Sequence, residues 1–245
     1  NTPGSQRVCT VAGAAQLRAM TALLLLGPQA PMLFQGQEFG ATTPFYYFFD
    51  QKGEAAEMVY EGRKGSLDQF PSIGQPEARD GVPPPHHLET LQRSKIDWRE
   101  AERNGHVVDF YRHLLTVRRT VPALVRAQGE RSLEASVITE SAFLLRYFGA
   151  QAGEDHLLLV NLGKDVTLRS VPDPLYAPPA GCKWVPRWSS EDPRYGGTGQ
   201  RQIDTVKPWV LTAHTALLFE AVPAERRDPP PKEDLDRWQQ ELARI

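Results

Sequence analysis

Hydrophobic and polar positions divide the chain into a mainly helical first part and a second part made of short strands. Residues 11–26 are rich in Ala and Leu, which predicts a helix that becomes more buried toward its C-terminal end. The stripe expected to face the core is Leu17, Met20 and Leu24. Gly27 is expected to end this helix, because glycine tolerates a left-handed backbone and the following Pro28 cannot continue a helix.

A short apolar run follows at residues 32–34, without polar alternation. Such a run is typical of a parallel strand covered on both faces, and Pro31 suits the first strand position, which need not donate to the ladder. Directly after it come the polar residues Gln35, Gln37 and Glu38. Polar groups at the C-terminal end of a buried parallel strand are where barrel and open α/β enzymes place their sites. A polar loop without a binding role is the alternative, and the pattern alone does not decide between them.

The strongest helical period in the sequence is carried by five residues at i, i+3, i+4, i+7 and i+8: Val107, Phe110, Tyr111, Leu114 and Leu115. Asn104 is expected to cap this helix, and Pro122 lies just past its end. Residues 54–69 predict another helix, whereas the proline- and glycine-rich residues 71–87 predict an excursion over the surface.

Six segments after this helix are predicted to be strands: 134–138, 142–148, 156–162, 166–171, 182–188 and 215–220. Several short strands after a helical region indicate a separate β-sandwich, so a domain boundary is expected near Pro122. The predicted division is residues 1–121, residues 122–222 for the sandwich, and residues 223–245 for a charged, proline-rich tail with a short polar helix.

Composition narrows the class of protein. The 245 residues are 40% hydrophobic and 24% charged, as expected for a globular protein, and the net charge of −2 gives no reason to expect nucleic acid or a membrane as partner. No signal-peptide pattern opens the chain. Cys9 and Cys182 show neither a metal spacing nor a disulfide framework, so a cytoplasmic location is expected. Because the first residue is Asn1, we expect this chain to be the back part of a longer protein.

Two carboxylates lie near the predicted site, Glu38 and Asp50. A glycosidase needs two carboxyl groups about 5–5.5 Å or 6.5–9.5 Å apart, but nothing in the spacing demands this, and a structural role in the loop is the alternative for both. Phe45, Tyr46 and Tyr47 offer apolar ring faces, and the tyrosines add polar edges, which suits stacking on sugar rings. Core packing is the competing interpretation of these rings.

The residues predicted to contact substrate are therefore Gln35, Gln37, Glu38, Phe45, Tyr46, Tyr47 and Asp50. No cofactor or metal is expected, since phosphate-binding and dinucleotide-binding motifs are missing and the adjacent His86 and His87 are poorly placed to share one ion. Residues 189–197 form either a ligand loop or a turn pinned by Asp192 and Arg194, and the turn is favoured.

Several segments carry a resemblance to a known family: residues 31–40, 44–48 with Asp50, 93–98, 114–124, 177–181 and 188–197. Together they resemble the end of the catalytic barrel in α-amylase-type glycoside hydrolases and, more narrowly, the malto-oligosyltrehalose trehalohydrolases. Residues 31–40 are similar across the whole superfamily, whereas the aromatic stretch and residues 188–197 narrow the resemblance. Phe49 and Gln51 depart from the pattern, in which Thr and His are more frequent.

The resemblance implies an α/β plus all-β fold, with strand eight and the following helices of a (β/α)8 TIM barrel followed by a C-terminal antiparallel β-sandwich. It implies retaining hydrolysis of the α-1,4 bond next to the terminal trehalose of malto-oligosyltrehalose, which releases trehalose in trehalose biosynthesis. The partners implied are malto-oligosyltrehalose or a related α-glucan, and the missing N-terminal part of the same enzyme.

The resemblance also places the nucleophile Asp, the acid Glu and the stabilising Asp upstream of Asn1. The last of these stands in a His-Asp pair, and this sequence contains no such pair. No catalytic residue is carried over, so the chain by itself is expected to be inactive. A glucan-branching enzyme of the same superfamily and a non-catalytic α-glucan-binding module are the alternatives.

Overall fold

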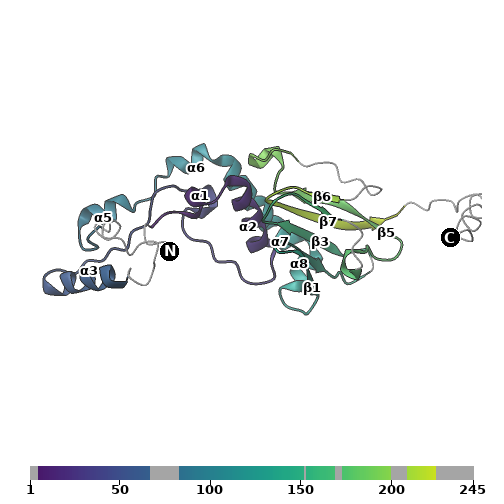
Figure 1. The fold of residues 1–245 in the computed structure, drawn as a ribbon, viewed down its shortest axis with the longest axis horizontal. Helices are drawn as coiled ribbons and strands as arrows, with labels where there is room; N and C mark the ends of the chain where they lie inside the picture. Colours follow the sequence, from purple (N-terminus) through teal and green to yellow (C-terminus); the bar gives the residue numbers. More distant parts are fainter. Residues whose placement is uncertain (1–4, 67–82, 152, 169–172, 200–208, 225–245) are drawn as a thin grey trace, which may run out of the picture.

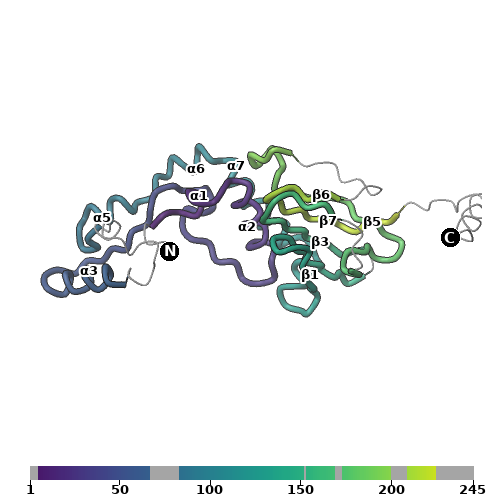
Figure 2. The backbone as a smooth tube through the Cα atoms, viewed as in Figure 1, coloured from purple at the N-terminus to yellow at the C-terminus, as the bar shows by residue number. Residues whose placement is uncertain are grey.

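The protein is described by a computed structural model that covers residues 5–66, 83–151, 153–168, 173–199 and 209–224. Helices and irregular segments occupy one end of an elongated molecule, and an antiparallel sheet occupies the other (Figures 1 and 2). The helices of the first part are α1 (Val8–Val11), α2 (Ala14–Leu26), the 3₁₀ helix η1 (Gln37–Phe39), α3 (Glu54–Ser66), α5 (Leu88–Arg93), α6 (Arg99–Arg103), α7 (Gly105–Thr120) and α8 (Pro122–Ala127).

Helix α2 confirms the predicted helix but buries another face than expected. Ala19, Ala22 and Leu25 are fully buried, whereas Met20 of the predicted stripe is 41% exposed. The other two members of that stripe, Leu17 and Leu24, are only half-buried. Small side chains let α2 approach α7 and the sheet closely, and this close approach decides which face becomes core.

The predicted strand at residues 32–34 is wrong. The segment forms no regular secondary structure, and Met32 is 87% exposed and Phe34 43% exposed. A strand requires a hydrogen-bonded neighbour, and no strand among the described residues pairs with this segment. Gly27 ends α2 as expected, but its backbone is extended, at φ −61°, and not left-handed. A side chain is excluded here because an added Cβ would lie 2.9 Å from the Leu23 carbonyl oxygen.

Helix α7 begins at Gly105, directly after Asn104, as the period predicts. The capping role of Asn104 is wrong, because its side chain makes no cap hydrogen bond. Its Nδ2 instead donates to the Phe39 carbonyl at 2.9 Å and ties η1 to the start of α7.

Each of the six predicted strands has a counterpart among the described residues, although residues 169–171 of one prediction lie outside them, and a further short strand was missed. They are β1 (Leu133–Thr139), β2 (Ala142–Tyr147), β3 (His156–Asn161), β4 (Val166–Leu168), β5 (Cys182–Ser189), β6 (Trp209–Leu211) and β7 (Thr215–Pro223). One sheet has the order β1-β2-β3-β7-β5 and the other pairs β4 with β6, with every pair antiparallel. The missed strand, β6, has only three residues, too few for alternation to mark it.

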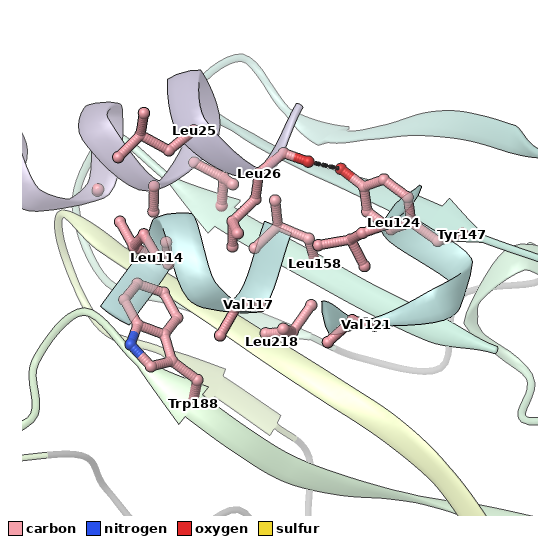
Figure 3. Packing of buried hydrophobic residues seen from close by; sticks show 14 of the residues in the cluster. Leu25, Leu26, Leu114, Val117, Val121, Leu124, Tyr147, Leu158, Trp188 and Leu218 are labelled. Atoms are coloured by element: carbon pink, nitrogen blue, oxygen red, sulfur yellow. Dashed lines mark hydrogen bonds between the residues drawn. The ribbon is translucent and has the colours of Figure 1, made fainter. Parts of the chain in front are cut away.

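Strand β3 shows how the layers are built, because all six of its residues are buried. Leu158 and Val160 point to the core shared with α2, α7 and α8, which also includes Leu114 and Leu218 (Figure 3). Leu157 and Leu159 point to the opposite face, where they pack with side chains of β4 and β6. The sheet is therefore covered by helices on one side and by the two-stranded sheet on the other.

The expected antiparallel β domain is thus present, while the end of a barrel and the division at Pro122 remain predictions. Pro122 is the first residue of α8, and the core on the helical face includes buried residues from both sides of it. Most of the predicted surface excursion at residues 71–87 and nearly all of the predicted tail at residues 223–245 lie outside the described residues. None of the helices in the described ranges is both long and apolar enough to cross a membrane.

Candidate functional site

The predicted site segment forms a tight turn around η1. Gly36 and Gly40 flank this helix with φ values of +85° and +65°, the left-handed region that favours glycine. The backbone N–H of Gln37 donates to the Phe34 carbonyl at 2.9 Å, and the backbone N–H of Ala41 donates to the Gly36 carbonyl at 2.8 Å. A Cβ at position 36 would lie 2.7 Å from the Ala41 Cβ. We call residues 35–41 the site turn.

Arg7 anchors the site turn and was not predicted from the sequence. Its guanidinium donates to the Gln35 carbonyl at 2.6 Å and to the Thr43 carbonyl at 2.7 Å, and it lies 5.0 Å from the centre of the Phe34 ring. The Cys9 thiol donates to the Ala41 carbonyl at 3.1 Å. These contacts join residues about thirty positions apart, and no motif in the sequence signals them.

A cavity of about 290 Å³ lies beside the site turn, lined by Arg7, Cys9, Phe34, Gln37 and Phe45 among others. The rings of Phe34 and Phe45 meet edge to face with 5.0 Å between their centroids. The cavity is at the small end of the range typical of ligand pockets. The structure thus brings together two of the predicted residues, Gln37 and Phe45.

Gln37 and Glu38 also lie near a buried tyrosine. Burial raises the pKa of Tyr111, hydrogen bonds with Thr21 and Gln37 oppose that rise, and the Glu38 charge adds to it. The Tyr111 hydroxyl lies 3.3 Å from the Thr21 Oγ1. At neutral pH this phenol is therefore protonated and available as a hydrogen-bond donor.

Tyr46 and Tyr47 contact other elements than the cavity. Arg93 of α5 donates to the Tyr46 hydroxyl at 3.1 Å and lies 4.8 Å from its ring centre. Arg63 of α3 lies 4.7 Å from the centre of the Tyr47 ring, which is 45% exposed. Each tyrosine therefore presents a ring face already occupied by a guanidinium.

The remaining predicted residues lie at the surface or half-buried. Gln35 is exposed and uses its carbonyl to accept from Arg7, Glu38 is half-buried in η1, and Asp50 is exposed. Substrate contact stays a prediction for these three residues, as it does for Gln37, Phe45, Tyr46 and Tyr47.

The adjacent histidines lie beside a carboxylate and beside each other. His86 lies 3.5 Å from the Glu57 carboxylate, and its ring centroid is 4.6 Å from that of His87. Within the part of the chain that the structure describes, no three His, Cys, Asp or Glu side chains gather as metal ligands.

Residues 189–197 form the turn that the sequence favours. The Asp192 carboxylate accepts from the Arg194 amide at 2.9 Å and from its guanidinium at 2.7 Å. These hydrogen bonds lower the pKa of Asp192. The neighbouring Glu191 was missed: it is buried and forms a 2.7 Å ion pair with Arg18 of α2.

Comparison with known proteins shows what this chain is similar to. Residues 130–218 match a family model described as a domain of unknown function, DUF3459. The chain is 38% identical over 152 residues to the malto-oligosyltrehalose trehalohydrolase of Deinococcus radiodurans, a match over 61% of this chain and 24% of that protein. It is 42% identical over 107 residues to the enzyme of that name from Rhizobium sp. (strain M-11), over 42% of this chain and 17% of that protein.

The fold has a solved counterpart as well. A crystal structure from Salmonella typhimurium, of a protein named as a candidate alpha amylase, superposes with a TM-score of 0.65 at 26% sequence identity. It covers 89% of this chain, which matches 32% of that protein. The chain spans about a quarter or less of the length of the first two trehalohydrolases. These matches confirm that the chain resembles the malto-oligosyltrehalose trehalohydrolases, within the α-amylase-type glycoside hydrolases.

Proposed function

We propose that this chain is the closing part of a retaining glycoside hydrolase that cleaves the α-1,4-glucosidic bond next to the terminal trehalose of malto-oligosyltrehalose and releases trehalose. The observation that carries the proposal is the identity of 38% over 152 residues to a protein with that name. That match covers 61% of the chain, more than the β domain alone supplies.

In this proposal residues 31–34, which pair with no strand among the described residues, become the last strand of a (β/α)8 barrel when the upstream part supplies the neighbouring strands. Its apolar side chains are exposed because the neighbouring strands belong to the upstream part of the enzyme: Met32 is 87% exposed and Phe34 43%. The site turn then lies at the C-terminal end of that strand, where barrel enzymes bind their substrates.

The chain's own contribution is substrate binding. The Phe45 ring beside the cavity offers an apolar face to a sugar, and the Gln37 amide offers a donor and an acceptor to sugar hydroxyls. Gln35, Glu38 and Asp50 add polar groups at the rim, and Tyr46 and Tyr47 extend the aromatic surface toward α5 and α3. The nucleophile and the acid of a retaining mechanism are supplied by the upstream part.

The test is trehalose release from malto-oligosyltrehalose, measured for the complete enzyme that contains this sequence and for the 245-residue chain alone. The complete enzyme is expected to release trehalose, and the chain alone to release none, because in this proposal the groups that form and protonate the glycosyl intermediate lie in the upstream part. Transfer to a new branch point without release would indicate a branching enzyme, and binding of α-glucan without turnover of the complete protein would indicate a binding module.

The same assay tests the site residues. In the complete enzyme, Gln37→Ala and Tyr46→Ala are each expected to weaken transition-state binding by roughly 1–3 kcal/mol, which corresponds to a loss of about 5- to 150-fold in kcat/KM. Gln92→Ala is the matched control, because Gln92 is exposed on α5. Wild-type kinetics for both site variants would remove Gln37 and Tyr46 from the binding site.

A further inference from the structure

The C-terminal end of α2 is held by side chains from distant elements. The last carbonyls of a helix have no partner within it and need donors from elsewhere. Here the chain runs from Leu26 through Gly27 and Pro28 to Gln29, and from there toward the site turn. The carbonyls of Leu25, Leu26, Gly27 and Gln29 all accept from side chains of α7 or β2.

Arg118 of α7 supplies three of these hydrogen bonds. Its Nη1 donates to the carbonyls of Leu25, at 2.9 Å, and of Gly27, and its Nη2 donates to the Gln29 carbonyl at 2.8 Å. The residue is only 7% exposed. A buried guanidinium at this position is stabilised by the negative end of the helix dipole. Its planar fork spans the last turn of α2 and the two residues that follow, which a lysine cannot do.

Tyr147 of β2 supplies the fourth hydrogen bond. Its hydroxyl donates to the Leu26 carbonyl at 2.8 Å, and the whole side chain is buried (Figure 3). Burial raises the pKa of Tyr147, so the hydroxyl keeps its proton at neutral pH. Side chains of the sheet and of α7 therefore both bind the C-terminal end of α2.

These hydrogen bonds bear on the site turn because residues 30–34 alone separate the held segment from the turn, with Leu33 packed against the core. Residues 30–34 form no regular secondary structure, and Met32 is 87% exposed. The turn itself is held by Arg7, which binds the carbonyls of Gln35 at its start and Thr43 just after it, and by the Cys9 thiol against the Ala41 carbonyl. The chain before the turn is fixed at residues 25–29, whose carbonyls Arg118 and Tyr147 bind.

We propose that Arg118 and Tyr147 are positioning residues, which set the place of the site turn by fixing the chain where it leaves α2. The proposal rests on the proposed function for its consequence in catalysis, since it assumes that the turn contacts substrate. Its structural part is independent of that function and is tested separately.

The structural test uses Cys9 as a reporter in the 245-residue chain. With Cys182→Ser as background, Cys9 is the one thiol left, and its reaction with a disulfide reagent is timed under native conditions. Arg118→Lys and Tyr147→Phe are expected to speed labelling at least threefold, because a displaced turn removes the Ala41 carbonyl from the thiol. Arg119→Lys, the exposed neighbour on α7, is expected to leave the rate unchanged.

A loss of overall stability would also expose Cys9, and a second control separates the two causes. Leu159→Ala removes a fully buried side chain that belongs to the core on the other face of the sheet, and it destabilises the fold. If Leu159→Ala speeds Cys9 labelling as much as Arg118→Lys does at equal unfolding free energy, the positioning role is overturned.

The catalytic arm uses the complete enzyme. Arg118→Lys is expected to raise KM for malto-oligosyltrehalose several-fold at a temperature where the variant is fully folded. A merely structural role would lower the apparent kcat in proportion to the folded fraction and leave KM unchanged, and that result would overturn the link to substrate binding. If the complete wild-type enzyme releases no trehalose, the proposed function fails, while Cys9 labelling still decides whether Arg118 and Tyr147 position the turn.

Discussion

Single buried polar residues in this chain connect segments that are far apart in the sequence. Arg146 of β2 forms a 2.8 Å ion pair with Asp155 and donates to the Ala177 carbonyl at 2.7 Å. Arg18 of α2 forms a second ion pair, at 2.7 Å, with Glu191 in the turn that follows β5. Breaking such a buried pair leaves an uncompensated charge, so each of these residues is expected to matter more for stability than the exposed ion pairs.

His156 at the start of β3 predicts how stability depends on pH. Burial lowers the pKa of His156, the Glu154 carbonyl opposes this, Arg187 adds to it, and Glu220 and Asp155 oppose it again. The unfolded chain therefore takes up the proton at a higher pH than the folded one. This contribution to stability is fully present above the unfolded pKa, about 6.5, and is lost as the pH falls below it.

The measurement is denaturant unfolding at pH 7.5 and pH 5.5. The wild-type chain is expected to lose unfolding free energy between these values, and His156→Gln, which has no titrating group, is expected to lose less. The exposed His87 supplies the control His87→Gln, which should keep the wild-type dependence on pH. An equal loss in wild type and His156→Gln would contradict the prediction.

Among the elements, η1 and α7 are joined by the side chain of Asn104. Asn104 stands where a capping residue is expected, yet it uses its amide to donate to the Phe39 carbonyl. Asp is as good a cap as Asn, but its carboxylate cannot donate. The substitution Asn104→Asp therefore distinguishes the two roles.

We expect Asn104→Asp to lower the unfolding free energy by about 1–2 kcal/mol, because the Phe39 carbonyl loses its donor and faces a negative charge. Chemical denaturation of the chain measures this value, with Asp109→Asn on the exposed side of α7 as the control. Unchanged or increased stability of Asn104→Asp would restore the capping role that the sequence predicted.

In the whole molecule, the sheet is unevenly covered, and its strands should open at different rates. Strand β3 is buried on both faces, between the helices and the β4–β6 sheet. Strand β1 is an edge strand with alternating exposure, and its Val137 is 78% exposed. Amide hydrogens exchange when the structure opens locally. Opening is rarest where it would break the most contacts between buried apolar side chains.

Amide exchange resolved by residue is therefore expected to be slowest in β3 and its partner β7, and fastest among the strands in β1. The exchange rates of β4 and β6 serve as an internal comparison. These two strands form the separate sheet that packs against one face of β3. Exchange in β3 as fast as in β1 would show that the layers on the two faces of the sheet do not protect it.

The sequence by itself determined most of the elements of this protein. Helices α2, α3 and α7 and six strands follow from apolar periodicity, because a side chain's period along the chain records which face must leave water. The turn pinned by Asp192 also follows from local chemistry. Residues 31–40 pointed to the α-amylase superfamily, and the aromatic stretch with residues 188–197 pointed to the malto-oligosyltrehalose trehalohydrolases, to one of which the chain is 38% identical over 152 residues.

The tertiary structure decided what depends on contact between distant residues. The face of α2 that becomes core, the failure of residues 32–34 to form a strand, and the divergence of Tyr46 and Tyr47 from Phe45 follow from which surfaces meet. Arg7 holds the site turn through hydrogen bonds to backbone carbonyls, and Arg118 holds the end of α2 in the same way. Since every residue has a carbonyl, no pattern of side chains marks which one an arginine will bind, and only the folded arrangement selects it.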